Sequence, residues 1–160
     1  QVAAERERVY APVRREEGPD WKELNMAVSK VMQVYCGEVK SREMLETGLE
    51  LLREMEEQEV PLLCARNPHE LVRTLETVNV LTTALIIMHA CLARRSSSPP
   101  LHFLRAEHPE PDAPEERRFI TVGLEGDTVA VGLLPLDYYR PIVENYERHN
   151  PDYLKGGGRR

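Results

Sequence analysis

The sequence lacks the features that several classes of protein require. It has no excess of basic residues, because 21 Lys and Arg stand against 27 Asp and Glu, and the formal net charge is -6. Such a chain offers no basic face to displace counterions from a phosphate backbone, which argues against a nucleic-acid partner. Its start, QVAAERERVY, is too charged for a signal peptide. No uninterrupted apolar run reaches the roughly 18 residues of a membrane span. We therefore expect a cytoplasmic protein without direct membrane insertion.

Cysteine is scarce and widely spaced. The three cysteines are Cys36, Cys64 and Cys91, so the sequence holds no CxxC-like pair of the kind that zinc and iron–sulfur sites use. An odd number of cysteines without an export signal favours reduced thiols. We expect the three thiols to be buried and inert.

Catalytic and cofactor motifs are also missing. The sequence has no GxGxxG after a strand, no GxSxG elbow and no Cys/His signature. The densest group of possible ligands is His102 and His108 with Glu107 and Glu110, but this spacing fits no zinc pattern. A small metal-binding protein is the weakest alternative, and His89 is expected to be a core or interface histidine. The prediction is that the chain holds no catalytic, cofactor-binding or metal-binding residue.

The longest regular stretch runs from Asn67 to Arg95 and predicts a helix. Asn67 is a suitable N-cap, Pro68 fits the first helical position, and Glu70 stands where a capping-box carboxylate belongs. Arg94 and Arg95 place positive charge at the negative end of the helix dipole. Apolar residues recur at helical spacing, namely Leu71, Val72, Leu75, Val78, Leu81, Leu85, Ile86, Met88 and Leu92. Because its second half is apolar on nearly every side, this helix should be surrounded by others.

Two shorter amphipathic helices precede it. Asp20 is a plausible N-cap for a helix over residues 21–35, with Gly37 as the C-terminal stop, and Ser41 caps a second helix to about Gln58. Residues 1–17 resemble a short charged helix interrupted near Pro12. Three helices with short links predict a mainly α fold, an antiparallel three-helix (spectrin-like) bundle.

The character of the chain changes after Arg95. Residues 96–118 carry five prolines, so this segment cannot continue the preceding helix or form a central strand. Leu101, Phe103 and Leu104 give this segment something to bury, so we expect it to be extended and pinned to a partner surface. Its serines, with the neighbouring arginines, could bind an anion, although a helix end wrapped by hydroxyls is the simpler interpretation.

A β-hairpin and a short helix are predicted to follow. Two β-branched runs, 119–122 and 128–133, flank the turn sequence Glu125-Gly126-Asp127. A short helix is expected over residues 140–149. We expect one domain overall, with the bundle in residues 1–95, residues 96–150 packed on it, and a flexible tail over 151–160.

The string ACLARRSSSPPLHFLRAEHPEPDAPEERRFITV resembles a C-terminal segment of flavoprotein subunits in the fumarate reductase and succinate dehydrogenase family. In that family a helix ends in Ala-Arg-Lys/Arg, and a Ser-rich turn, a His or Phe, an Arg and an acidic-aromatic-Pro-Glu step follow. The matching residues are Ala93, Arg94, Arg95, Ser97, Ser98, His102, Phe103, Arg105, Glu107, His108, Pro109 and Glu110. The family's usual Asp-Tyr-Pro is Glu107-His108-Pro109 in this chain, which removes any role that needs the phenol.

Further strings extend the resemblance over most of residues 2–150. MQVYCGEVKSREMLETGLELL, NPHELVRTLETVNVL and LLPLDYYRPIVENYERHN are similar to the branch that includes the adenylylsulfate reductase α subunit. The order and spacing of the motifs carry the match more than any one of them does.

The resemblance implies a C-terminal helical domain of an FAD-dependent oxidoreductase, a parent that passes electrons between flavin and a small acceptor. The FAD-binding and capping domains would lie upstream, in agreement with a chain that lacks an initiator Met and that we expect to be a piece of a longer protein. The domain would serve as scaffold and docking surface for the flavin domain and a possible iron–sulfur subunit. The candidate docking residues are Arg94, Arg95, Ser97, His102, Arg105 and Glu110.

We expect Arg105→Ala to weaken association while leaving the isolated bundle nearly as stable. The alternative function is a stand-alone helical protein-interaction module without flavin.

Overall fold

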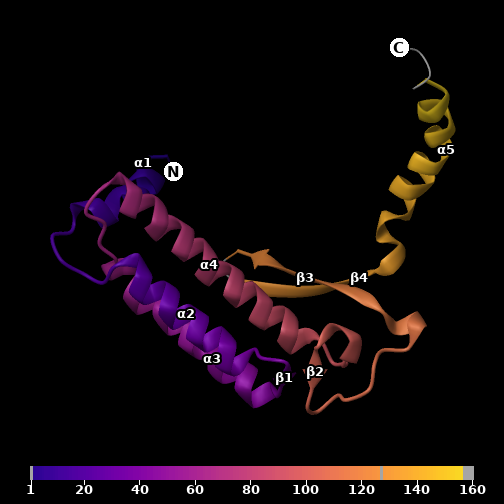
Figure 1. Ribbon diagram of the computed structural model, residues 1–160, viewed down its shortest axis with the longest axis horizontal. Helices are drawn as coiled ribbons and strands as arrows, with labels where there is room; N and C mark the ends of the chain where they lie inside the picture. Colours follow the sequence, from indigo (N-terminus) through magenta and orange to yellow (C-terminus); the bar gives the residue numbers. More distant parts are fainter. Residues whose placement is uncertain (1, 127, 157–160) are drawn as a thin grey trace. The chain divides into compact units, whose positions relative to one another are not determined.

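The structure is a computed structural model, and it describes residues 2–126 and 128–156 (Figure 1). The chain divides into two compact units, residues 1–111 and residues 112–160, and each is described by itself. The boundary lies within the proline-rich segment rather than at Arg95, so residues 96–111 belong with the helices. The expected packing of residues 112–150 on the bundle stays a prediction.

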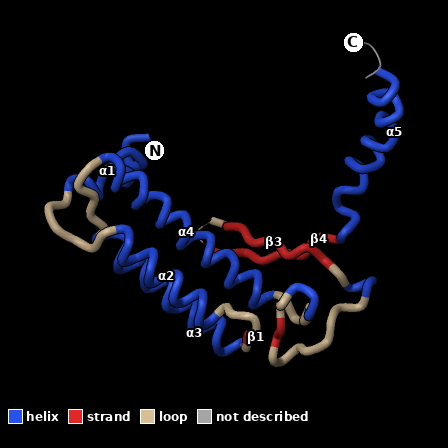
Figure 2. The backbone as a smooth tube through the Cα atoms, viewed as in Figure 1, coloured by secondary structure: helices blue, strands red, loops and turns tan. Residues whose placement is uncertain are grey.

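The first unit is a bundle of three helices that pack pairwise against one another (Figure 2). They are α2 (Trp21–Tyr35), α3 (Arg42–Glu54) and α4 (Pro68–Ala93). A charged helix, α1 (Val2–Tyr10), precedes them and gives way to a 3-10 turn at Ala11–Arg14, as the proline at position 12 predicts. The mainly α bundle predicted from the sequence is confirmed.

The predicted N-caps are all present. Asp20, Ser41 and Asn67 have extended backbones, and their side chains accept hydrogen bonds from first-turn N–H groups that would otherwise lack a partner. The Glu70 carboxylate accepts from the backbone N–H of Arg66 rather than from that of Asn67. The capping bonds are Lys22 N–H to Asp20 (2.8 Å), Glu23 N–H to Asp20 (3.2 Å), Met44 N–H to Ser41 (3.1 Å) and Glu70 N–H to Asn67 (2.9 Å).

The helices end slightly differently from the prediction. The α-helical part of α3 ends at Glu54, and the chain continues as a π-helical turn, Met55–Glu59, and a 3-10 turn, Val60–Leu62. The expected end at Gln58 therefore falls inside the π-helical turn. Helix α4 ends at Ala93, because the backbone of Arg94 is already extended (φ -73°, ψ 118°).

The core of the bundle is formed by one face of each helix. Gly48 of α3 faces Tyr35 of α2 and Met88 of α4, and this glycine allows the three helices to approach closely. The buried cluster consists of Leu24, Val28, Val31, Leu45, Leu49, Leu52, Leu63, Leu81, Ala84, Met88 and Cys91.

Helix α4 is long and apolar enough to cross a membrane, with a window of mean hydropathy 1.6. A single helix of this kind is weak evidence for a membrane span, because the central helix of a bundle has the same length and composition. Only 28% of that window is buried in the structure, so one side of α4 is left exposed.

The second unit contains the predicted hairpin. Strands β3 (Arg118–Glu125) and β4 (Thr128–Pro135) pair antiparallel, with Glu125 opposite Thr128. Gly126 has φ +63°, a left-handed conformation that glycine adopts readily in such a turn. Short 3-10 turns flank the hairpin at Pro114–Glu116 and Leu136–Tyr139.

Helix α5 (Arg140–Gly156) is longer than predicted, since it continues past residue 149 with Pro151 in its interior. A proline is a probable rather than a certain helix boundary. The tail that the sequence predicts to be flexible is thus helical over residues 151–156, and residues 157–160 lie outside the described residues.

Candidate functional site

Residues 96–110, here called the closing segment, connect α4 to the end of the first unit. Strand β2 (Leu104–Arg105) within this segment pairs in parallel with β1 (Val39–Lys40), in the loop between α2 and α3. Leu104 N–H donates to Glu38 O at 3.0 Å, and Ala106 N–H donates to Lys40 O at 2.9 Å. The segment is therefore ordered as expected, but the surface that holds it belongs to its own bundle.

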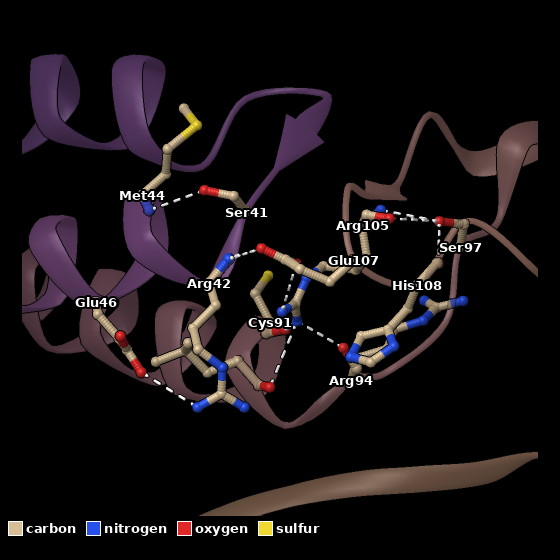
Figure 3. A network of polar contacts seen from close by, with 11 residues as sticks. Ser41, Arg42, Met44, Glu46, Cys91, Arg94, Ser97, Arg105, Glu107 and His108 are labelled. Carbon is tan, nitrogen blue, oxygen red and sulfur yellow. Dashed lines mark hydrogen bonds and ion pairs between the residues drawn. The ribbon is translucent and has the colours of Figure 1, made fainter.

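Arg105 is the most deeply buried charged group of the closing segment, with 1% of its side chain exposed. Its Nη1 donates to the backbone carbonyls of Cys91 and Arg94 at the end of α4, the latter at 2.6 Å (Figure 3). The last carbonyls of a helix lack intrahelical partners and carry partial negative charge, so a guanidinium satisfies both needs. Among the described residues the Nε of Arg105 has no hydrogen-bond partner, which leaves a desolvation cost at the same site.

Glu107 acts on the opposite end of another helix. Its Oε1 accepts from the backbone N–H of Arg42, the first residue of α3, at 2.6 Å, and its Oε2 lies 3.4 Å from Arg105 Nη2 (Figure 3). The Arg42 N–H bond, with help from the Arg105 guanidinium, lowers the pKa of Glu107 below its ordinary value. Glu107 thus supplies the negative charge that a helix N-terminus favours.

Ser97 fixes the fold of the segment itself. Its hydroxyl accepts from Arg105 N–H at 2.8 Å and donates to the His108 carbonyl at 2.7 Å, while its own N–H donates to the Glu110 carbonyl at 2.9 Å. Because Ser97 is buried, these bonds replace water as the partners of its hydroxyl and its N–H.

Phe103 lies between two cations. The Lys40 ammonium is 4.4 Å and the Arg94 guanidinium carbon 4.5 Å from the centre of its ring, distances that suit cation–π contacts. Lys40 is buried and donates to the carbonyl of Glu38 at 3.1 Å. The preceding His102 adopts a left-handed backbone (φ 50°), which turns the chain into this contact.

The structure separates the six candidate docking residues into two groups. Ser97 and Arg105 are buried and hold the closing segment, so they offer no side-chain surface to a partner in this conformation. Their burial also argues against the expectation that Arg105 matters little for the stability of the bundle. Arg95, His102 and Glu110 are exposed and Arg94 is partly exposed. Docking through these four stays a prediction.

The remaining histidines and acids do not assemble into a metal site. Over residues 2–126 and 128–156, no group of three or more His, Cys, Asp or Glu side chains is placed to hold an ion. His89 lies on α4, and its Nε2 is 3.3 Å from Arg53 Nη2. Partial burial, and then the Arg53 charge, lower the pKa of His89.

Sequence reasoning missed three participants: the buried Lys40, the helix-capping role of Glu107, and the contact between Cys36 and Cys91. The Sγ atoms of the two cysteines are 3.8 Å apart. Cys36 is partly exposed, whereas Cys64 and Cys91 are buried as expected. No sequence signal marks a pair 55 positions apart. The predicted helices do place each cysteine near the C-terminal end of its helix.

The exposed side of α4 carries several large apolar side chains among polar ones. Val80, Ile86 and Ile87 expose 45%, 45% and 41% of their surfaces, and Val72 exposes 54%. Val80 and Ile87 stand seven residues apart, a spacing that places side chains on one side of a helix. These four residues are called the exposed row of α4, and the same helix also exposes Arg73, Glu76, Asn79, Thr82 and Thr83.

Comparison with known proteins places the chain in a family. A family model described as the fumarate reductase flavoprotein C-term matches residues 25–140. A search of curated proteins gave no match.

Three solved structures have a similar fold. Adenylylsulfate reductase from Archaeoglobus fulgidus matches with a TM-score of 0.77 and 23% identity over 84% of this chain and 24% of that one. Quinol fumarate reductase FrdA from E. coli matches with a TM-score of 0.71 and 19% identity, again over 84% of this chain and 24% of that one. The Sdh1 complex of Mycobacterium smegmatis matches with a TM-score of 0.69 and 18% identity over 83% of this chain and 23% of that one. At these identities the likeness shows the fold alone, and the chain spans about a quarter of each of those chains. The family model covers most of the chain, and the chain belongs to the C-terminal domains of the fumarate reductase flavoprotein family.

Proposed function

We propose that this chain is the helical scaffold and docking domain of an FAD-dependent oxidoreductase of the fumarate reductase type. The flavin and the substrate-handling residues belong to preceding domains, and this chain contributes no complete active site. The observation that carries the proposal is a set of large exposed apolar side chains on the central helix of a domain from this flavoprotein family.

The exposed row on α4 has the chemistry of a contact surface. Val80 and Ile87 stand seven residues apart, and Ile86 and Val72 extend the row. Fully burying one such side chain is worth about 1.5–3 kcal/mol, and contiguous exposed apolar patches mark interaction sites. The partner we assign to this face is the flavin-binding part of the parent enzyme.

The ionic groups of the closing segment support a structural role. Arg105 and Glu107 are committed to the ends of α4 and α3, and Lys40 is committed to Phe103 and a carbonyl. Groups that satisfy helix ends are not available for acid–base chemistry on a substrate.

The test uses the gene and two polypeptides. The DNA that precedes residue 1 is expected to continue in frame and to encode a strand–GxGxxG–helix signal for FAD. That upstream part, expressed separately, should bind the present chain, with affinity measured by calorimetry. Ile87→Asp should weaken binding by about tenfold or more. Met26→Asp is the matched control, since Met26 is an exposed apolar residue of α2 (70% exposed).

Two outcomes would redirect the proposal. A start codon near residue 1, with no flavin-binding extension, would favour the stand-alone interaction module. A stoichiometric flavin spectrum of the present chain alone, after incubation with FAD and desalting, would overturn the assignment of the cofactor to upstream domains.

The second docking surface in this proposal is the charged end of α4, where an iron–sulfur subunit would bind. Arg95 is exposed next to the partly exposed Arg94, whereas the chain as a whole is acidic. An acidic partner would find local positive charge from these two arginines. Arg95→Glu should slow association with that subunit, and Arg66→Glu, an exposed residue remote in sequence, should not. Equal association rates for the two variants would place this partner elsewhere.

A further inference from the structure

We propose that Cys36 and Cys91 form a site of reversible oxidation, at which a hydroperoxide converts the two thiols into a disulfide. The bond would tie the end of α2 to the last turn of α4. This inference does not depend on the flavin-docking proposal.

The geometry brings the two sulfurs into contact from different helices. Their Sγ atoms are 3.8 Å apart, so a disulfide of about 2.0 Å requires them to approach by roughly 1.8 Å. Cys36 is the C-cap of α2, with a backbone outside the helical region (φ -122°, ψ 28°), and Gly37 follows it. Small rotations at this helix end can supply the movement without disturbing the buried Cys91.

The surroundings differ for the two thiols and assign their roles. The hydrogen bond to Cys91 and the nearby Lys40 ammonium lower the pKa of Cys36 to about 7, against the opposing effect of burial. The same hydrogen bond and burial raise the pKa of Cys91. Cys36, partly exposed and next to a buried cation, has the character of a reactive cysteine. Cys91 is the resolving thiol.

The chemistry balances in two steps. The Cys36 thiolate attacks one oxygen of hydrogen peroxide and breaks the O–O bond, giving a sulfenic acid at Cys36 and, after protonation, water. The Cys91 sulfur then attacks the Cys36 sulfur, and the hydroxyl departs with a proton as a second water. The two sulfurs lose two electrons in total, and the peroxide is reduced by two. A dithiol such as dithiothreitol reverses the change.

Cys64 provides a matched control within the same unit. It is buried, and its thiol donates to the Arg15 carbonyl at 3.1 Å. In the sequence it is far from both Cys36 and Cys91. It should stay reduced under conditions that oxidise the pair.

The experiment treats the 160-residue chain with hydrogen peroxide, blocks remaining thiols with N-ethylmaleimide and maps the peptides by mass spectrometry. The expected product is a monomer with a Cys36–Cys91 link, a mass lower by two hydrogen atoms, and one blocked thiol at Cys64. Its Tm should exceed that of the reduced chain by roughly 5–10 °C, because the cross-link restricts the unfolded state. Cys64→Ser should behave the same, and Cys91→Ala should leave a sulfenic acid at Cys36 that dimedone traps.

Three results would overturn the proposal. They are three blocked thiols after peroxide treatment, a link that includes Cys64, or cross-linking only between molecules. Circular dichroism of each variant identifies any that fails to fold. If Cys91→Ala does not fold, Cys36→Ser, which is altered at a helix end, serves as the second test. In that variant neither remaining thiol should be oxidised.

Discussion

The side chains of Arg105 and Glu107 lie 3.4 Å apart, and each satisfies the end of a different helix. Arg105 donates to carbonyls at the C-terminus of α4, and Glu107 accepts from the N-terminus of α3. Each charge matches the sign that its helix end favours. The two helix ends that meet at this pair belong to neighbouring antiparallel helices, so one short stretch, residues 105–107, binds both ends.

Arg105→Ala should destabilise the bundle by about 2–5 kcal/mol, because it removes the donor from the carbonyls of Cys91 and Arg94 at the end of α4. Arg105→Lys should fall between alanine and wild type, since an ammonium keeps the charge but loses the second nitrogen, Nη2, that lies 3.4 Å from Glu107. Urea unfolding followed by circular dichroism measures the change. Arg95→Ala, at an exposed neighbour, should stay within about 0.5 kcal/mol of wild type. A loss for Arg105→Ala no larger than for this control would restore the view that Arg105 serves docking alone.

Glu107→Gln should reduce the acid sensitivity of the fold. The pKa of Glu107 is lower in the folded state, so the folded state binds fewer protons, and the stabilisation from this carboxylate is present above its unfolded pKa. That stabilisation is lost as the pH falls through the folded pKa. Thermal melts across the carboxyl titration range should therefore show a smaller drop in Tm for Glu107→Gln than for wild type. Glu110→Gln, at an exposed neighbour, is the control; equal drops for wild type and Glu107→Gln would contradict the capping role.

His89 should make the fold less stable at mildly acidic pH. Its pKa is lowered in the folded state by burial and by Arg53, so the unfolded chain takes up the proton first as the pH falls. Stability is then lost between the unfolded pKa and the lower folded one. Between about pH 7.5 and about pH 5.5, the Tm of His89→Gln should fall less than that of wild type. His69→Gln is the comparison, and identical slopes for all three proteins would exclude His89 as the source.

Gly48→Ala should destabilise the bundle although alanine favours helices. A Cβ at this position would lie 2.7 Å from Met88 Cε and 2.7 Å from Tyr35 Cβ. Overpacking of this kind costs about 1–3 kcal/mol, more than the roughly 0.5–1 kcal/mol that replacing a helical glycine gains. Gly123→Ala, in strand β3 of the second unit, places a Cβ that meets no atom within 4 Å; it is the control for a glycine without close neighbours and should not lower the stability of the bundle. An increase in stability for Gly48→Ala would mean that the helices can move apart at little cost.

The helices could be predicted from the sequence because their signals are local. Caps at Asp20, Ser41 and Asn67 and the apolar spacing of α4 act over one or two helical turns, and they placed each helix start correctly. The hairpin followed in the same way from its turn residues. The closing segment was recognised as ordered from its apolar residues, but what holds it was not predictable. Its pairing with β1 joins residues that are far apart in the sequence, and no local periodicity encodes that contact.

The same reason separates the predicted from the observed roles of Ser97 and Arg105. Their residue types suit a docking surface as well as a buried polar network, and only the fold decides between the two. The family motif that contains them identified the segment. The structure shows which of its polar groups form hydrogen bonds inside the bundle. Among the candidate docking residues, Arg95, His102 and Glu110 remain exposed.

The parallel pairing of Val39 with Leu104 also constrains the order in which the chain can fold. A contact of such long sequence separation pays a large loop-closure entropy, so it forms after the local helices. On the ribosome, α2, α3 and α4 can assemble before Leu104 emerges. Until Arg105 and Glu107 follow, the carbonyls at the C-terminus of α4 and the Arg42 N–H at the start of α3 lack these two partners. The closing segment is therefore the last part of the bundle to be added during synthesis. A chain stalled before it would expose helix ends without these hydrogen-bond partners to chaperones and proteases.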